Sequence, residues 1–156
     1  MLERVNDQNW NQVSWDGRDA AGMELTGRIL IVDDDPHFLR VLARILSGEN
    51  FLVTSAAGAC DALELLKSAH FDLIISDLRM PECDGLNFLD SLRQSGNAVP
   101  VIILTAYGEV DTYLAAMNAG AVEYLNKPIQ SEELLKIVRA CLRSQAHRRH
   151  TLSRDL

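Results

Sequence analysis

The stretch FDLIISDLRMP, residues 71–81, carries the clearest fold signal of this chain. Residues 73–75 form an uninterrupted apolar run, which is typical of a strand covered on both faces in a parallel sheet. Asp77 follows at the carboxyl end of this strand, where open α/β sheets bind their ligands. Met80-Pro81 then turns the chain towards the next helix. The stretch predicts a sheet that presents a carboxylate at its edge, although strand-ending aspartates also occur as plain turn formers or helix caps.

The same alternation of a short apolar run and a helical pattern recurs along the chain. We expect strands at residues 29–32, 51–54, 73–75, 99–104 and 122–125. A helix with apolar residues at helical spacing is predicted after each strand. Strands that alternate with helices in this way form a parallel sheet with right-handed crossovers and helices on both faces. No G-x-G-x-x-G follows the first strand and no G-x-x-x-x-G-K-[ST] is present, which argues against dinucleotide and nucleoside-triphosphate binding.

Capping residues predict where several helices begin and end. Asp35 suits the N-cap of the first helix, because Pro36 suits the first helical position. Ser131 is expected to cap the fifth helix, and Gly120 to end the fourth. The buried stripe of the fifth helix extends to Leu142.

Length and composition limit the class of protein. The 156 residues suit one domain with modest tails, and 47% hydrophobic residues are enough for a core. The net charge of −7 argues against a general nucleic-acid binder, which usually carries a basic face. No apolar run approaches the roughly 20 residues of a membrane span, and the first residues lack the pattern of a secretory signal. Three cysteines without paired spacing predict reduced thiols in a cytoplasmic protein, with neither a disulfide framework nor a zinc site.

The chain divides into three segments. Residues 1–26 are polar and lack periodicity, so we expect a mostly disordered extension; its Trp10 and Trp15 are either incidental or a short docking segment. Residues 27–145 form the folded domain. Residues 146–156 are a basic tail, for which a helix end followed by a frayed terminus is favoured over a contact with nucleic acid or an acidic partner.

Polar residues follow four of the predicted strands and should meet at one edge of the sheet. They are Asp33, Asp34, Asp77, Thr105 and Lys127. Two adjacent carboxylates need a cation nearby, and a hard ion such as Mg²⁺ prefers oxygen ligands. Carboxylates, a hydroxyl and an ammonium are what phosphoryl transfer to a carboxylate requires. Each residue alone has an ordinary structural explanation, but five together at the ends of four strands favour this chemistry.

Five pieces of the sequence resemble response-regulator receiver domains of two-component signalling. These are ILIVDDDP (29–36), SDLRMPECDG (76–85), LTAY (104–107), AGAVEYL (119–125) and Lys127-Pro128. The resemblance covers about residues 27–145. It implies a flavodoxin-like (βα)5 fold, a single doubly wound parallel sheet with the strand order 2-1-3-4-5 of chemotaxis receivers.

The resemblance also implies the roles of the acidic residues. Asp77 would be the phosphoacceptor that forms an aspartyl phosphate. Asp33 and Asp34 would hold Mg²⁺ together with Asp77 and the main-chain carbonyl of Arg79. The protein would not be an enzyme in the usual sense, since it would catalyse only its own phosphorylation and dephosphorylation.

Further positions would transmit and tune the signal. Lys127 would contact the phosphoryl group, and its peptide bond to Pro128 is expected to be cis. Thr105 would be the switch hydroxyl and Tyr124 the aromatic side chain that turns inward with it. Arg79 and Tyr107 would tune the rate of dephosphorylation.

The resemblance implies partners as well. A sensor histidine kinase or histidine phosphotransfer protein would donate the phosphoryl group, and residues 109–142 would dock an output protein or a second copy. Two alternatives remain at this point. One is an aspartyl-phosphate phosphohydrolase, which commonly has a second acid where this chain has Arg79; the other is a receiver-like binding module that is not phosphorylated.

Overall fold

The computed structural model describes residues 27–106 and 108–154, and residues 146–154 by their backbone alone. The expectations for residues 1–26, with Trp10 and Trp15, and for Tyr107 lie outside the described residues. Within the described part, no helix is long and apolar enough to cross a membrane.

The fold is a parallel five-stranded sheet with the order β2-β1-β3-β4-β5, which confirms the predicted architecture and strand order. The strands are β1 (Arg28–Val32), β2 (Leu52–Ala56), β3 (Leu73–Ser76), β4 (Val101–Thr105) and β5 (Glu123–Asn126). The helices are α1 (Pro36–Ser47), α2 (Ala59–Ser68), α3 (Gly85–Gln94), α4 (Val110–Asn118) and α5 (Ser131–Arg154).

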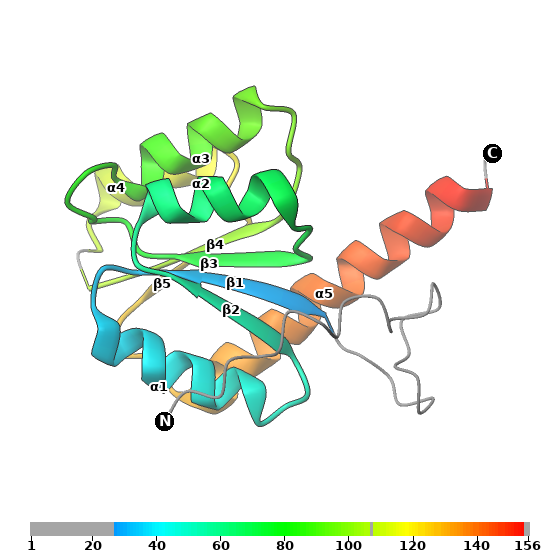
Figure 1. Ribbon diagram of the computed structural model, residues 1–156, viewed down its shortest axis with the longest axis horizontal. Coiled ribbons are helices and arrows are strands. Elements are labelled where there is room, and N and C mark those ends of the chain that lie inside the picture. The colour runs from blue at the N-terminus through cyan, green and yellow to red at the C-terminus, as the bar shows by residue number, and fades with distance from the viewer. Residues whose placement is uncertain (1–26, 107, 155–156) are drawn as a thin grey trace.

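Helices cover both faces of the sheet, and each face has its own core (Figure 1). On one face, α1 and α5 pack against side chains such as Ile29, Ile31 and Ile75. On the other, α2, α3 and α4 pack against alternate residues such as Leu30 and Ile74. The three central strands are therefore apolar on both sides, which is why the sequence shows continuous apolar runs there.

Two of the three predicted helix ends agree with the structure. The side chain of Asp35 accepts hydrogen bonds from the backbone N–H of His37 (2.9 Å) and Phe38 (3.4 Å), which confirms it as the cap of α1. Gly120 follows α4 with a φ of +103°, a conformation that glycine adopts without strain. Ser131 is not a cap: it is the first residue of α5, and the carbonyl of Gln130 accepts the hydrogen bond from Leu134 N–H (3.0 Å).

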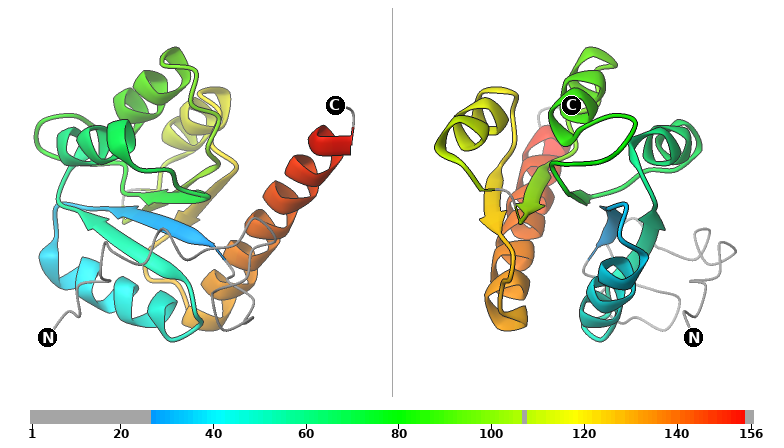
Figure 2. Two further views of the ribbon diagram at one scale, coloured as in Figure 1. Left: turned by 45° about the vertical axis from the view of Figure 1, so that its right-hand side comes forward. Right: turned by 90° about the vertical axis from the view of Figure 1, so that its left-hand side faces the viewer.

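α5 is longer than the sequence analysis predicted. The expected frayed terminus after the apolar stripe is wrong for the backbone, which stays helical to Arg154. Residues 143–154 contain no glycine or proline, so nothing in the local sequence stops the helix. The distal half of α5 extends away from the sheet as a single rod (Figure 2).

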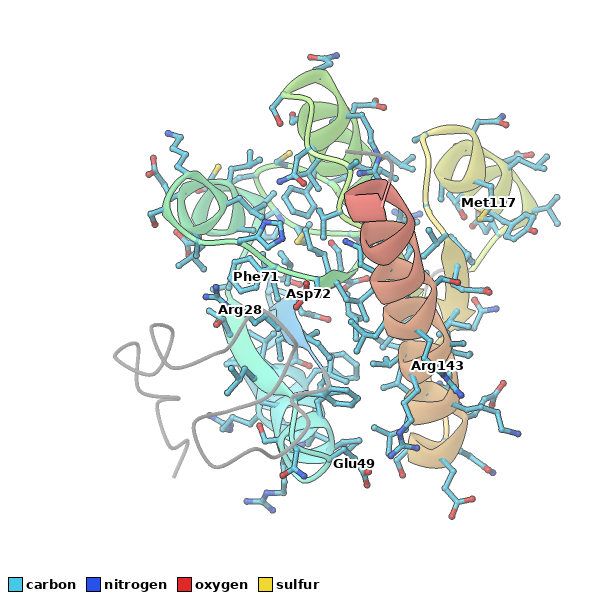
Figure 3. All side chains as sticks on the ribbon, turned by 90° about the vertical axis from the view of Figure 1, so that its right-hand side faces the viewer. Arg28, Glu49, Phe71, Asp72, Met117 and Arg143 are labelled. Carbon is cyan, nitrogen blue, oxygen red and sulfur yellow. The ribbon has the colours of Figure 1, made fainter. Side chains whose placement is uncertain are left out.

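A separate cluster lies where β1 and β3 begin, at the opposite edge of the sheet from Asp33 and Asp77. Asp72 accepts a hydrogen bond from Arg28 N–H (2.9 Å), and the guanidinium of Arg28 lies 5.4 Å from the centre of the Phe71 ring. Figure 3 shows these three residues together. They anchor the start of β1 to the segment before β3.

Candidate functional site

Backbone pairing brings the predicted residues to one edge of the sheet. Asp33 follows β1 and Asp77 follows β3, and the N–H of Asp77 donates to the carbonyl of Val32 (2.9 Å). Thr105 is the last residue of β4, and its carbonyl accepts from the N–H of Lys127 (2.8 Å). These residues lie together because the strands are parallel and their carboxyl ends meet at the same edge of the sheet.

Lys127 ties two carboxylates together. Its Nζ lies 2.7 Å from Oδ2 of Asp33 and 3.5 Å from Oδ2 of Asp77. Both aspartates are buried, with 2% and 7% of their surface exposed, whereas Asp34 is exposed. A positive charge between two buried carboxylates offsets the repulsion that they would otherwise exert on each other.

The remaining carboxylate oxygens are held by backbone groups. Oδ1 of Asp33 accepts from the N–H of Asp35 (2.9 Å), and Oδ1 of Asp77 accepts from the N–H of Leu78 (2.7 Å). Burial raises the pKa of Asp33, and the hydrogen bond from Lys127 opposes this only in part. The folded protein therefore disfavours the charged form of Asp33 even with the ammonium of Lys127 beside it, and a metal ion would favour that form.

The three aspartates are arranged as a metal ion would require. One carboxylate oxygen from each of Asp33, Asp34 and Asp77 lies within 4.8 Å of the others. Carboxylate oxygens are the ligands of hard cations such as Mg²⁺. The donor set therefore fits the ion that the sequence predicts.

These residues line an open pocket of about 780 Å³. Arg79 and Ala106 lie in its wall, as do Asp33, Asp34, Asp77 and Lys127. Thr105 is fully buried at the end of β4 and does not line the pocket, and the peptide bond between Lys127 and Pro128 is cis, as predicted.

Tyr124 is partly buried and connects β5 to α4. Its hydroxyl lies 2.8 Å from Oγ1 of Thr112, and its ring packs edge-to-face on Tyr113, with the ring centres 5.6 Å apart. Thr112 also lines the acidic pocket. Tyr124 is thus one hydrogen bond away from a residue of the pocket wall.

Sequence reasoning missed two residues that shape the site. The ammonium of Lys127 lies 3.9 Å from the centre of the Phe38 ring, a cation–π contact that helps to hold it. Gly85 approaches the backbone so closely that a Cβ there would lie 2.9 Å from the Cα of Leu78 and against the carbonyl oxygen of Asp77. The glycine after Asp84 was a visible signal for a tight approach, but the sequence held no signal for Phe38.

Comparisons with known proteins agree on one family. The family model of the response regulator receiver domain matches residues 29–139. The regulatory protein AtoC of Escherichia coli (strain K12) is 38% identical over 124 residues, which are 80% of this chain and 27% of AtoC. The response regulator MprA of Mycobacterium ulcerans is 41% identical over 116 residues, 74% of this chain and 50% of MprA. The chain thus spans between about a quarter and a half of the length of these relatives.

Solved structures give the same result. The CheY-like receiver domain protein of Methanospirillum hungatei JF-1 has a TM-score of 0.74 and 30% identity, over 78% of this chain and 97% of that one. The receiver domain of a putative Luxo repressor protein of Vibrio parahaemolyticus has a TM-score of 0.77 and 27% identity, over 80% and 96%.

Proposed function

This chain belongs to the response regulator receiver domain family, and we propose that Asp77 is the residue on which it accepts a phosphoryl group. The observation that carries the proposal is the position of the Asp77 carboxylate. It lines an open pocket, 3.5 Å from an ammonium and beside two further carboxylates. This is the environment in which a carboxylate can act as a nucleophile towards phosphorus.

The donor would be a phosphohistidine of a sensor histidine kinase or phosphotransfer protein. An oxygen of Asp77 attacks phosphorus, the P–N bond breaks as the new P–O bond forms, and the imidazole nitrogen leaves with the electron pair and takes up a proton. Mg²⁺ held by Asp33, Asp34, Asp77 and the main-chain carbonyl of Arg79 would supply positive charge to the phosphoryl oxygens.

Lys127 supplies the second positive charge. Its ammonium already lies 2.7 Å from an oxygen of Asp33 and 3.5 Å from one of Asp77, so a small movement would bring it to an oxygen of a phosphoryl group on Asp77. The same movement weakens its bond to Asp33. Phosphorylation would therefore redistribute charge at the ends of β1, β3 and β5.

The response would appear on the face formed by α4, β5 and α5. Lys127 N–H is bonded to Thr105, and Tyr124 is bonded to Thr112 of α4, so changes at the pocket reach this face through short connections. Among the described residues, four of the five large exposed apolar side chains lie on α4 or just before β5: Val110, Tyr113, Leu114 and Val122. Figure 3 shows α4, with Met117, and α5, with Arg143, on either side of β5. We propose that an output protein or a second copy docks here, within residues 109–142. The proposal involves no direct binding of nucleic acid by this chain.

The test is the intact mass of the protein after incubation with acetyl phosphate and Mg²⁺. We expect one added phosphoryl group on the native chain and none on Asp77→Asn. Prior addition of EDTA should also prevent it. Asp90→Asn is the matched control, because Asp90 is an exposed aspartate on α3, outside the pocket.

An adduct on Asp77→Asn, or its absence from the native chain, would contradict the proposal. Rapid hydrolysis is excluded by a parallel experiment with beryllofluoride, which forms a stable complex with a competent receiver aspartate. A native chain that fails both experiments would be a binding module that is not phosphorylated.

A further inference from the structure

A second, smaller pocket lies beside the acidic pocket and is lined by two cysteines. Its volume is about 330 Å³, and Cys60 and Cys83 both contribute to its wall. Asp34, Met80 and Pro81 line both pockets, so the two cavities share one side. A change in the second pocket therefore acts on residues that also form the first.

The two cysteines come from neighbouring elements on the same face of the sheet. Cys60 is exposed in the first turn of α2, and Cys83 is half-buried in the loop between β3 and α3. Cys83 Sγ donates a weak hydrogen bond to the carbonyl of Asp84 (3.7 Å). Because Cys83 belongs to a loop, its backbone can adjust to a new covalent partner more easily than that of a helical residue.

The surroundings of Cys83 favour its protonated form. Burial raises the pKa of Cys83, and the negative charges of Asp84 and of ionised Cys60 add to the effect. Cys83 therefore keeps its proton more readily than a free thiol does. Cys60, on the exposed rim, is the thiol that an oxidant reaches first.

We propose that Cys60 and Cys83 form a reversible intramolecular disulfide when the protein meets a hydroperoxide. The peroxide oxidises the thiolate of Cys60 to a sulfenic acid, and its second oxygen leaves as water or alcohol. The sulfur of Cys83 then attacks the sulfenic sulfur as its thiol proton passes to the sulfenic oxygen; the S–S bond forms, the S–O bond breaks, and water leaves. Two thiols lose two electrons and two protons in total, and the peroxide takes up both.

The thiol pair is not a preformed metal site. In the part of the chain that the structure describes, the aspartates of the first pocket are the only group of three close metal-binding side chains. Cys60 and Cys83 therefore lack the third ligand that a zinc site would need.

The bridge would tie the start of α2 to the loop that carries Arg79. This consequence, unlike the bridge itself, rests on the proposed function, because it concerns access to Asp77. The bridged loop would hold Met80 and Pro81, which line both pockets, in one position and so restrict access to Asp77. We expect the oxidised protein to be phosphorylated by acetyl phosphate several-fold more slowly than the reduced protein. A dithiol reductant should restore the rate of phosphorylation.

The experiment uses the full chain, treated with hydrogen peroxide and digested without reduction. We expect a peptide pair joined through Cys60 and Cys83 and the loss of two hydrogen atoms per chain. Cys60→Ser and Cys83→Ser should each abolish the bridge. Cys141→Ser should leave it unchanged, because Cys141 packs on the other face of the sheet, with the core between α1 and α5.

Dimers between chains, or Cys60 sulfinic acid without the bridge, would overturn the proposal. If the bridge forms but the phosphorylation rate is unchanged after oxidation, the coupling to Asp77 is wrong while the modification site stands. If the reduced chain is not phosphorylated at all, the proposed function fails, and the peptide map still decides on the bridge.

Discussion

At the scale of single residues, the ammonium of Lys127 pairs with the two buried carboxylates of the acidic pocket. Its ammonium lies within hydrogen-bond distance of Asp33 and close to Asp77, both of which are expected to hold Mg²⁺. Lysine and metal ion therefore compete for the same carboxylates. We predict that Lys127→Met binds Mg²⁺ about tenfold more tightly, equivalent to about 1.4 kcal/mol, but is phosphorylated more slowly. A Mg²⁺ titration followed by the NMR shift of the Leu78 amide, which donates to Asp77, measures the affinity.

The control is Lys67→Met, since Lys67 is exposed on α2 and pairs only with Glu64 among the described ion pairs. Its Mg²⁺ affinity should equal that of the native chain. An unchanged or weaker Mg²⁺ affinity in Lys127→Met would contradict the idea that the ammonium competes with the metal ion for Asp33 and Asp77.

At the scale of the elements, the start of α3 packs closely on the backbone of Asp77 and Leu78 and holds it in position. Gly85 N–H donates to the carbonyl of Leu78 (2.7 Å), and a Cβ at Gly85 would press on backbone atoms that cannot yield. We predict that Gly85→Ala lowers the free energy of unfolding by about 1–3 kcal/mol and also slows phosphorylation. Urea denaturation measures the first effect and intact mass the second.

Gly58→Ala is the matched control, because a Cβ at Gly58, just before α2, meets nothing within 4 Å. It should change stability by no more than about 0.5 kcal/mol. Equal losses in the two variants would mean that the close approach of Gly85 to Asp77 does not matter.

At the scale of the whole molecule, the acidic pocket links stability to pH and to Mg²⁺. Burial raises the pKa of Asp33 above 3.8 in the folded state. Without metal, the stability from this group is complete below its unfolded pKa and is lost as pH rises through the raised value. Mg²⁺ binds the deprotonated site, so it should stabilise the fold above that value, by about 2.7 kcal/mol at one hundred times its Kd.

Urea unfolding with MgCl₂, or with NaCl at equal ionic strength, measures this increment across pH. It should shrink as pH falls through the raised pKa of Asp33, and Asp33→Asn should largely remove it. A gain from Mg²⁺ that is equally large at low pH or in Asp33→Asn would place the ion elsewhere.

The alternation of strands and helices along the chain and the convergence of the acidic residues at one edge of the sheet could both be predicted from the sequence. Both depend on local patterns: continuous apolar runs mark buried strands, and Asp33, Asp77 and Thr105 follow or end those runs. Parallel strands end at one edge whatever their order, so the convergence of these residues needed no further information. The resemblance to receiver domains added the strand order and the individual roles.

The contacts between distant segments could not be predicted from the sequence and became visible in the folded chain. Phe38 holds Lys127, and Cys60 shares a pocket with Cys83, through packing that no local pattern encodes. The apolar residues of α4 predicted the helix but not which of its residues are buried. Val110 and Leu114 are 74% and 52% exposed, and only Ala116 of this helix is buried. Periodicity identifies an apolar stripe, but whether it faces the core or a partner depends on how the crossovers place the helix against the sheet.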